Sequence, residues 1–248
     1  MNTSSSLFSE THTIATYQVD SNCRLTIPNV LMLLQEIAWK HVNIHQLGYQ
    51  DLHRQGLFWV LAKMKLVMHR YPKWTDTLQL NTWSKQPELL TAFRDFEGRD
   101  EQGNLYFSAT SSWHILSLAS GRPQAMTDFA KAFPHLAGEH AIAAPPAKLP
   151  APANPQQTSN GVVHPSDIDM HLHVNNTRYV QWVVDSFGFE FLQHNAIQEM
   201  EVNFLSQAKD GDAYNVLTTA LSDTEYITAV QGQSNLKDWV RVRIVWAL

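Results

Sequence analysis

Four ionisable side chains lie at alternate positions in one short segment of the chain, SDIDMHLHVNN at residues 166–176. Side chains alternate between the two faces of an extended chain, so these four would share one face. A carboxylate beside an imidazole can act in general acid–base or nucleophilic catalysis. A helix beginning just after the segment would add unpaired backbone N–H groups, which can stabilise a developing oxyanion. The segment is therefore a candidate catalytic site, built from Asp167, Asp169, His171 and His173.

Two other interpretations of this segment remain open. The aspartates could be turn residues beside surface histidines, with Asn175 and Asn176 capping the helix. His171-x-His173 could also supply metal ligands, but no distant pair of Cys or His residues completes a familiar spacing. The chain has no Gly-x-Ser-x-Gly elbow and no Gly-rich phosphate loop. We expect an acid–base site with no metal and no cofactor.

The elements that would position this segment follow from hydrophobic periodicity. Helical spacing of apolar residues predicts one helix over residues 27–47 and another over 176–192, the latter preceded by an extended piece at 162–173. Alternating apolar and polar residues predict strands at 63–72, 77–83, 89–97, 105–116, 200–205, 214–221, 225–231 and 239–246. Asp100–Gly103 suits a hairpin turn between two of them. The first half is thus one long helix followed by an antiparallel meander.

The order of these elements repeats after a proline-rich segment, residues 141–157, that predicts an extended linker. Before the first helix DSNCR (20–24) matches DMHLH (169–173) before the second. MKLVM (64–68) likewise matches MEVNF (200–204), with a lysine and an aspartate following at the same spacing. We interpret this as an internal duplication. Chance agreement between two short α+β sequences is the alternative.

The composition sets the broad class of protein. The 248 residues are 44% hydrophobic and 17% charged, which is typical of a folded soluble protein. A net charge of −5 argues against a nucleic-acid partner. The one cysteine, Cys23, excludes an intramolecular disulfide and favours a reducing compartment. No stretch has the pattern of a secretory signal or a membrane span, so we expect a cytoplasmic protein with no membrane insertion.

The segment SDIDMHLHVNNTRYVQW (166–182) resembles the active-site segment of the acyl-ACP thioesterase family, whose pattern is Asp-x-Asn-x-His-Val-Asn-Asn-x-x-Tyr. Further similarity at residues 35–48, 59–76, 93–103 and 109–116 extends the resemblance over nearly the whole chain. The resemblance implies an α+β fold of two tandem hotdog domains, each an antiparallel sheet wrapped around a long central helix. It also implies hydrolysis of the thioester of fatty acyl-[acyl-carrier-protein], releasing free fatty acid.

Carried over residue by residue, the family's catalytic Asp falls on Asp169 and its His on His173. The family's Asn falls on His171 and its Glu on Gln207, so the chain departs from the pattern at two positions. The resemblance implies that His173 is the general base or acid, and that Asp169 orients it or attacks the thioester as nucleophile. His171 and Gln207 would position water or the carbonyl group.

The two halves would then divide the work. The expected domains are residues 1–140, which would hold the acyl chain, and 158–248, which would catalyse, joined by the linker. The first half has Arg24 where the second has His173, so we expect one active site per chain. Candidate substrate-binding residues are Trp59, Met64, Met68, Asn175 and Asn176, although ordinary core packing explains the first three equally well.

A basic stretch without acids is the candidate docking surface for acyl carrier protein, an acidic partner that would present the fatty acyl phosphopantetheine. Its residues are Lys63, Lys65, Arg70 and Lys73, and a charged outer strand face is the plainer alternative. Two other functions compete: a hotdog dehydratase acting on hydroxyacyl thioesters, and a non-catalytic acyl-binding module. The length and saturation of the acyl chain are not predicted, and a homodimer is left open.

Overall fold

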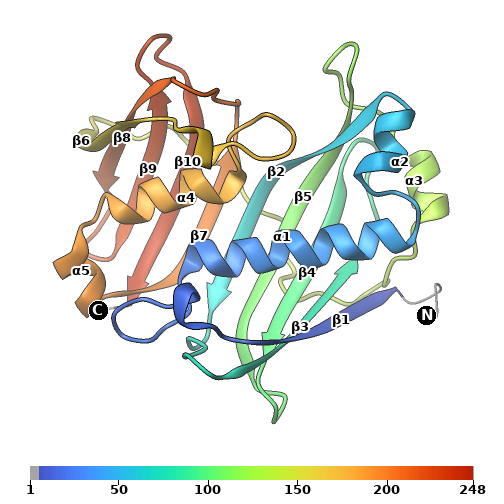
Figure 1. Ribbon diagram of the computed structural model, residues 1–248, viewed down its shortest axis with the longest axis horizontal. Helices are drawn as coiled ribbons and strands as arrows, with labels where there is room; N and C mark the ends of the chain where they lie inside the picture. The colour runs from blue at the N-terminus through green and yellow to red at the C-terminus, as the bar shows by residue number, and fades with distance from the viewer. Residues whose placement is uncertain (1–5, 248) are drawn as a thin grey trace. The chain divides into compact units, whose positions relative to one another are not determined.

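The computed structural model describes residues 6–247, and the chain divides into two compact units. The first comprises Met1–Leu25 and Val30–Pro146, and the second comprises Thr26–Asn29 and Ala147–Leu248. Each unit contains an antiparallel sheet with one main helix across it (Figure 1).

The first unit pairs its strands antiparallel in the order β1-β3-β4-β5-β2. The predicted turn at Asp100–Gly103 is confirmed: it joins β4 to β5, and the N–H of Gly103 donates to the carbonyl of Asp100 at 3.0 Å. Gly103 has a φ of +84°, a conformation that glycine adopts without steric cost. The elements are β1 (Leu7–Thr13), α1 (Ile27–Ile44), α2 (Tyr49–Arg54), β2 (Leu57–Met68), β3 (Thr77–Ser84), β4 (Ala92–Arg99), β5 (Leu105–Ser117) and α3 (Thr127–Ala132).

The second unit pairs its strands antiparallel in the order β6-β8-β9-β10-β7, which is the order of the first unit, strand for strand. This agreement confirms the internal duplication. The elements are β6 (Gln156–Val162), α4 (Asn176–Asp185), α5 (Phe189–His194), β7 (Ala196–Phe204), β8 (Ala213–Ala220), β9 (Glu225–Gly232) and β10 (Asp238–Ala247).

The lysine–aspartate pairs that follow β2 and β7 show that the duplication reaches individual hydrogen bonds. The backbone N–H of Lys73 donates to the Asp76 carboxylate at 2.9 Å, and that of Lys209 donates to Asp212 at 2.9 Å. In each unit the same aspartate accepts, through its carbonyl, a backbone bond from the residue just after the edge strand, at 3.0 Å in the first unit and 2.9 Å in the second. The pairs therefore join equivalent turns in the two copies.

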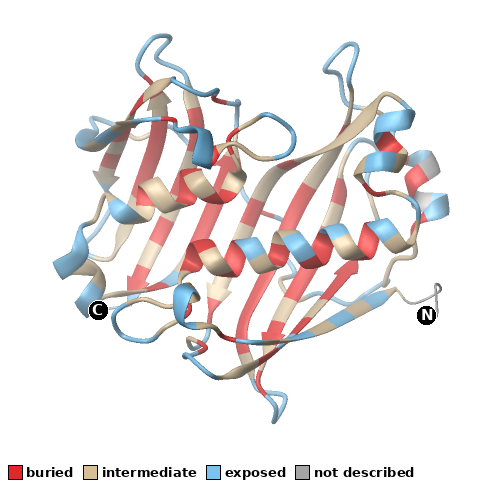
Figure 2. Cartoon of the chain, viewed as in Figure 1, coloured by how far each residue is buried: buried red, intermediate tan, exposed pale blue. Residues whose placement is uncertain are grey.

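Each unit has a core between its main helix and its sheet (Figure 2). On α1 the apolar positions Leu34 and Ile37 are fully buried, as the helical spacing requires. In the second unit Trp182 of α4 stacks on Tyr214 of β8, with ring centroids 4.2 Å apart. Aromatic packing of this kind lets the shorter helix α4 cover its sheet.

Several elements differ from the prediction. The second helix ends at Asp185 rather than residue 192, because Gly188 adopts a φ of +82° and separates the short helix α5. The linker prediction is too long, since β6 already begins at Gln156. The edge strands β1 and β6 and the short helices α2 and α3 were not predicted, and α1 ends at Ile44.

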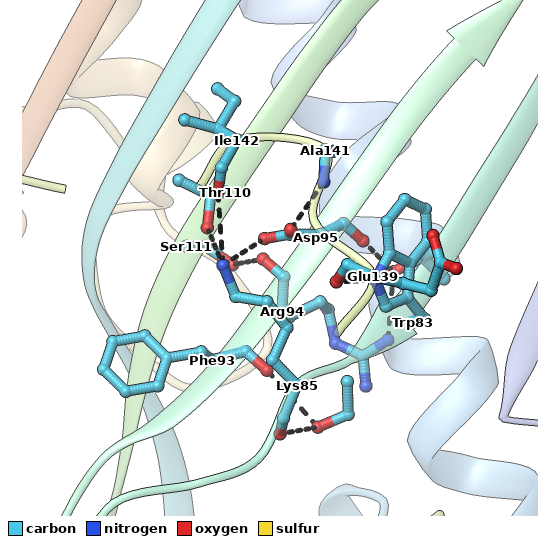
Figure 3. Close-up of polar contacts among 12 residues, drawn as sticks. Trp83, Lys85, Phe93, Arg94, Asp95, Thr110, Ser111, Glu139, Ala141 and Ile142 are labelled. Atoms are coloured by element: carbon cyan, nitrogen blue, oxygen red, sulfur yellow. Dashed lines mark hydrogen bonds and ion pairs between the residues drawn. The ribbon is translucent and has the colours of Figure 1, made fainter. Parts of the chain in front are cut away.

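The linker is held near its start and near its middle by buried polar side chains. Near its start the N–H of Ala141 donates to the carboxylate of Asp95 at 2.8 Å, and Lys85 donates to the carbonyl of Ile142 (Figure 3). Lys85 and Asp95 also form a buried ion pair at 3.0 Å. Further along, the amide of Asn203 accepts from the N–H of Leu149 and donates to the carbonyl of Ala147, at 2.8 and 2.9 Å. These bonds supply backbone partners that a proline-rich segment cannot supply itself.

Candidate functional site

The ionisable segment folds into a hairpin with a three-residue loop rather than an extended run. We call Asp169–His173 the second hairpin and its counterpart Asp20–Arg24 the first hairpin. In the second hairpin the N–H of Asp169 donates to the carbonyl of His173 at 2.8 Å, and that of Leu172 donates to the carbonyl of Asp169 at 3.0 Å. Leu172 has a φ of +61°, the left-handed conformation that closes such loops. The prediction of one shared face is therefore wrong, because the turn breaks the alternation.

Asp167 lies outside the site that the second hairpin forms. It is buried in the 3-10 turn Pro165–Asp167, where its carboxylate accepts the N–H of His164 at 2.9 Å. It also lies 3.7 Å from the guanidinium of Arg178. These contacts give Asp167 a structural role at the base of the hairpin.

Asp169 and His173 are coupled through their charges. One oxygen of the Asp169 carboxylate accepts the N–H of His171 at 2.8 Å. Within residues 6–247 no hydrogen bond joins that carboxylate to the ring of His173. Burial lowers the pKa of His173, the charges of His171 and Lys209 lower it further, and Asp169 partly opposes them. The lowered pKa favours the neutral imidazole, the form that is able to accept a proton.

Gln207 lies on the exposed loop after β7. The next residue, Ala208, donates its N–H to the phenol oxygen of Tyr179 on α4 at 2.9 Å. Burial raises the pKa of Tyr179 to about 12, and the nearby charges of Asp212 and Asp169 also raise it. Tyr179 thus anchors the Gln207 loop to α4. The charge of Lys209, on the same loop, acts to lower the pKa of His173 on the second hairpin.

Asn175 caps the helix that follows the hairpin. Its side-chain oxygen accepts from the N–H of Thr177 at 3.0 Å and from the Thr177 hydroxyl at 2.8 Å. This is the contact of an N-cap residue, so Asn175 fixes the start of α4. Asn176 is the first residue of the helix and is half-buried.

Most of the chain is similar to one family. The model of the acyl-ACP thioesterase N-terminal domain matches residues 5–132, and that of the acyl-ACP thioesterase C-terminal domain matches residues 152–247. The chain belongs to the acyl-ACP thioesterase family.

Two plant relatives illustrate the range of similarity. Oleoyl-acyl carrier protein thioesterase 2, chloroplastic, of Arabidopsis thaliana is 27% identical over 244 residues, which cover 91% of this chain and 66% of the relative. Palmitoyl-acyl carrier protein thioesterase, chloroplastic, of Cuphea hookeriana is 26% identical, with 80% and 51% covered. The chain thus spans between half and two thirds of the length of these relatives.

Solved structures confirm the fold. An acyl-ACP thioesterase from Bacteroides thetaiotaomicron VPI-5482 superposes with a TM-score of 0.91 at 21% identity, covering 100% of both chains. The 12:0-ACP thioesterase from Umbellularia californica gives 0.86 at 21% identity, covering 98% of both. The predicted α+β fold of two tandem hotdog domains is therefore correct.

In this acyl-ACP thioesterase family member, the predicted acyl-chain residues lie in the first unit. Met64 and Met68 are buried core residues of β2. Trp59 packs edge-on against Phe129, with ring centroids 5.0 Å apart, and donates its indole N–H to the carbonyl of Leu47 at 3.0 Å. Met64 and Met68 are thus buried, and Trp59 packs against a buried apolar cluster, positions that suit either packing or acyl binding.

The residues of the basic stretch predicted to dock the carrier differ in solvent exposure and in the contacts that they already make. Lys63 and Lys65 are half-buried on β2, and Lys73 is exposed. Arg70 forms an ion pair with Asp100 and lies over the ring of Tyr106, 4.2 Å from its centroid. The guanidinium of Arg70 is therefore already engaged within the unit.

One buried cation in the first unit was not predicted. Arg94 of β4 is 5% exposed, and its guanidinium donates to the Nδ1 atom of His41 and to the Thr82 hydroxyl, both at 3.0 Å. It also lies 5.4 Å from the ring centroid of Phe133. No carboxylate in the described part of the chain pairs with it, and burial lowers its pKa to about 9. A charged residue at a core-facing strand position was the available signal.

Two further surveys concern only the described residues, 6–247. No group of three or more His, Cys, Asp or Glu side chains is arranged to hold a metal ion. No helix has both the length and the apolar character needed to cross a membrane.

A groove of about 590 Å³ in the second unit contains none of the predicted site residues. Linker residues Ala151, Pro152 and Pro155 form part of its lining.

Proposed function

We propose that this chain hydrolyses the thioester of fatty acyl-[acyl-carrier-protein], releasing free fatty acid and the carrier protein. The observation that carries the proposal is that His173 and Asp169 lie on one hairpin of an acyl-ACP thioesterase family member, where burial lowers the pKa of His173. A neutral imidazole can activate water, and a thiolate is a good leaving group. The relatives named as thioesterases of oleoyl- and palmitoyl-acyl carrier protein support the substrate class.

In the proposed mechanism His173 takes a proton from water as the water oxygen attacks the thioester carbonyl. The C–S bond then breaks, and the thiolate of the phosphopantetheine leaves with the proton from His173. Asp169 stabilises the imidazolium by its charge, because it acts to raise the pKa of His173. His171 and Gln207 position the water or the carbonyl oxygen.

A second route uses Asp169 as the nucleophile. One of its oxygens is held by the N–H of His171, and the described residues form no hydrogen bond with the other. That oxygen would attack the carbonyl, expel the thiolate and form an acyl anhydride. Water, activated by His173, would then release the fatty acid. Both routes need the same two residues.

We further propose that the first unit holds the acyl chain, with Trp59, Met64 and Met68 as lining, and that Asn175 and Asn176 contact the substrate near the second hairpin. Each chain would then have one active site, because Arg24 replaces the imidazole in the first hairpin. A cytoplasmic place in fatty acid synthesis fits the lone Cys23. A homodimer is the assembly that we would look for first.

The deciding experiment is a thiol-release assay on a series of acyl-ACP substrates of increasing chain length. We expect thiol release above that of a His173→Ala control, with a preferred chain length. Binding of acyl-ACP without thiol release would support the non-catalytic acyl-binding module. Dehydration of a hydroxyacyl substrate without thiol release would support the dehydratase.

The predicted docking stretch gives a second test of the carrier. Reversing Lys63 and Lys65 to Glu should weaken turnover of acyl-ACP and spare a small acyl thioester, because only the acidic carrier is repelled. The loss should shrink as salt rises, since exposed charges are screened beyond about 8 Å at physiological ionic strength. Equal losses on both substrates would point to a damaged fold, and unchanged turnover of acyl-ACP would place docking elsewhere.

A further inference from the structure

The tip of the second hairpin carries two large apolar side chains in water. Met170 is 65% exposed and Leu172 is 79% exposed. Leu172 also adopts a φ of +61°, a conformation in which a bulky side chain is disfavoured. The left-handed backbone costs stability, and the two exposed apolar side chains gain nothing from folding. Two large apolar side chains exposed together at one point indicate a functional contact.

The first hairpin shows that the fold does not require these side chains. It has the same backbone bonds, from Asp20 N–H to the Arg24 carbonyl and from Cys23 N–H to the Asp20 carbonyl, both at 2.9 Å. Cys23 has a φ of +58°, close to that of Leu172. Ser21 and Cys23, both exposed, occupy the positions of Met170 and Leu172. The apolar tip is therefore confined to the copy that has the imidazole.

The neighbours of the tip indicate what approaches it. His173 directly follows Leu172, and Lys209 lies close enough to His173 for its charge to lower the pKa of the imidazole. Lys209 is exposed. The acid at the base of the hairpin, Asp167, is buried and faces Arg178 at 3.7 Å. An apolar tip beside an exposed lysine is complementary to a partner surface that combines apolar and acidic side chains.

We propose that Met170 and Leu172 are the point at which the second hairpin docks the acyl carrier protein, with Lys209 facing its acidic side chains. This inference rests on the proposed function, because that function identifies the carrier as the acidic partner. It gives the carrier a contact in the second unit that the Lys63–Lys73 stretch does not supply. Apolar contact at the tip adds affinity that salt does not screen.

The test uses Leu172→Gly with Cys23→Gly as the matched control. Glycine relieves the left-handed backbone in both hairpins, so both variants should melt a few degrees above wild type. Only Leu172→Gly should lower kcat/KM for acyl-ACP, by about tenfold. Turnover of an acyl-N-acetylcysteamine thioester, which has no carrier protein, should stay within about twofold. Met170→Ser should give a smaller loss of the same selectivity, and the loss should persist at high salt.

Calorimetric binding of the holo-carrier protein separates this inference from the proposed function. If Leu172→Gly binds the carrier more weakly and Cys23→Gly binds it as wild type does, the docking role of the tip is supported. That result would hold even if wild type hydrolysed neither substrate. Failure to hydrolyse either substrate would overturn the proposed hydrolase function instead. Unchanged carrier binding and unchanged turnover of acyl-ACP would overturn the docking tip. Equal losses on both thioesters, or binding of wild type to anionic lipid vesicles that Leu172→Gly abolishes, would also overturn it.

Discussion

The first and second hairpins share a backbone and differ in what surrounds one carboxylate. In the first, Asp20 accepts the N–H groups of Asn22 and Arg24 on one oxygen and the Arg24 guanidinium on the other, all at 2.9 Å. In the second, the Asp169 carboxylate accepts the N–H of His171, and its charge acts on an imidazole. A carboxylate that an arginine neutralises cannot act as nucleophile or charge partner. The duplicated turn thus supplies geometry, and the residue at its end supplies the chemistry.

The largest expected effect comes from giving the second hairpin the ending of the first. His173→Arg should lower turnover by about 100-fold or more, because it removes the proposed base and neutralises Asp169. The measurement is thiol release, with circular dichroism to show an unchanged fold. Arg24→His is the reciprocal control and should add no activity. Near-wild-type turnover in His173→Arg would show that the reaction occurs elsewhere.

A smaller effect is expected where this chain departs from its family's pattern. Gln207→Glu would supply a carboxylate and His171→Asn a smaller hydrogen-bonding group. A rise in turnover of up to about tenfold for Gln207→Glu would show that a second base helps. An unchanged rate would show that His173 and Asp169 suffice. Steady-state kinetics on one acyl-ACP, with the double variant included, distinguishes these results.

The acid limb of the pH–rate profile should move in opposite directions in two variants. Lys209 lowers the pKa of His173, so Lys209→Gln should raise that pKa and move the loss of activity to higher pH. Asp169 raises the pKa of His173, so Asp169→Asn should lower that pKa. The acid limb of the activity that this variant retains should then move to lower pH. The measurement is kcat/KM for a small acyl thioester, which avoids any effect of Lys209 on docking. A limb that stays in place in both variants would mean that another group titrates.

The smallest effect concerns the first hairpin alone. Arg24→Gln removes a partly exposed ion pair, so it should lower the free energy of unfolding by about 0.5–1 kcal/mol. Turnover should be unchanged, because the first hairpin has no imidazole. Denaturant unfolding beside the thiol-release assay tests both statements. A large loss of turnover would contradict the division of roles between the hairpins.

Much of the fold could be predicted because buried apolar residues recur with the period of a helix or a strand. Alternation identified most of the strands, and repeated spacings identified the duplication. The edge strands escaped because their inward positions are only half-buried and mostly polar: β1 reads LFSETHT, with alternating exposed and half-buried residues. The break after Asp185 escaped because Phe187 and Phe191 continue the apolar pattern beyond the helix, by packing on Trp246.

The site was predicted in composition but not in shape. Asp169 and His173 came from the resemblance, whereas their spacing alone suggested an extended strand. Local hydrogen bonds overrode that pattern, because the Asp169 carboxylate holds the N–H of His171 and folds the chain back. Neither glycine nor asparagine marks the left-handed position at Leu172, so the turn had no signal in the sequence. The effect of Lys209 depends on a loop distant in sequence, and no local pattern predicts it.

The hydrogen bonds that Asp95, Lys85 and Asn203 form with the linker also determine where the chain can be divided into fragments. A first-half fragment that ends at residue 140 would lack the N–H of Ala141 and the carbonyl of Ile142, which hold Asp95 and Lys85. Buried polar groups that lose their partners cost about 1–3 kcal/mol each. A fragment that continues to Pro146 keeps both contacts, and one that starts at Ala147 keeps those of Asn203. Proteases should therefore cut this linker slowly, despite its proline-rich composition. Cleavage would first require the linker to break its hydrogen bonds with these buried side chains.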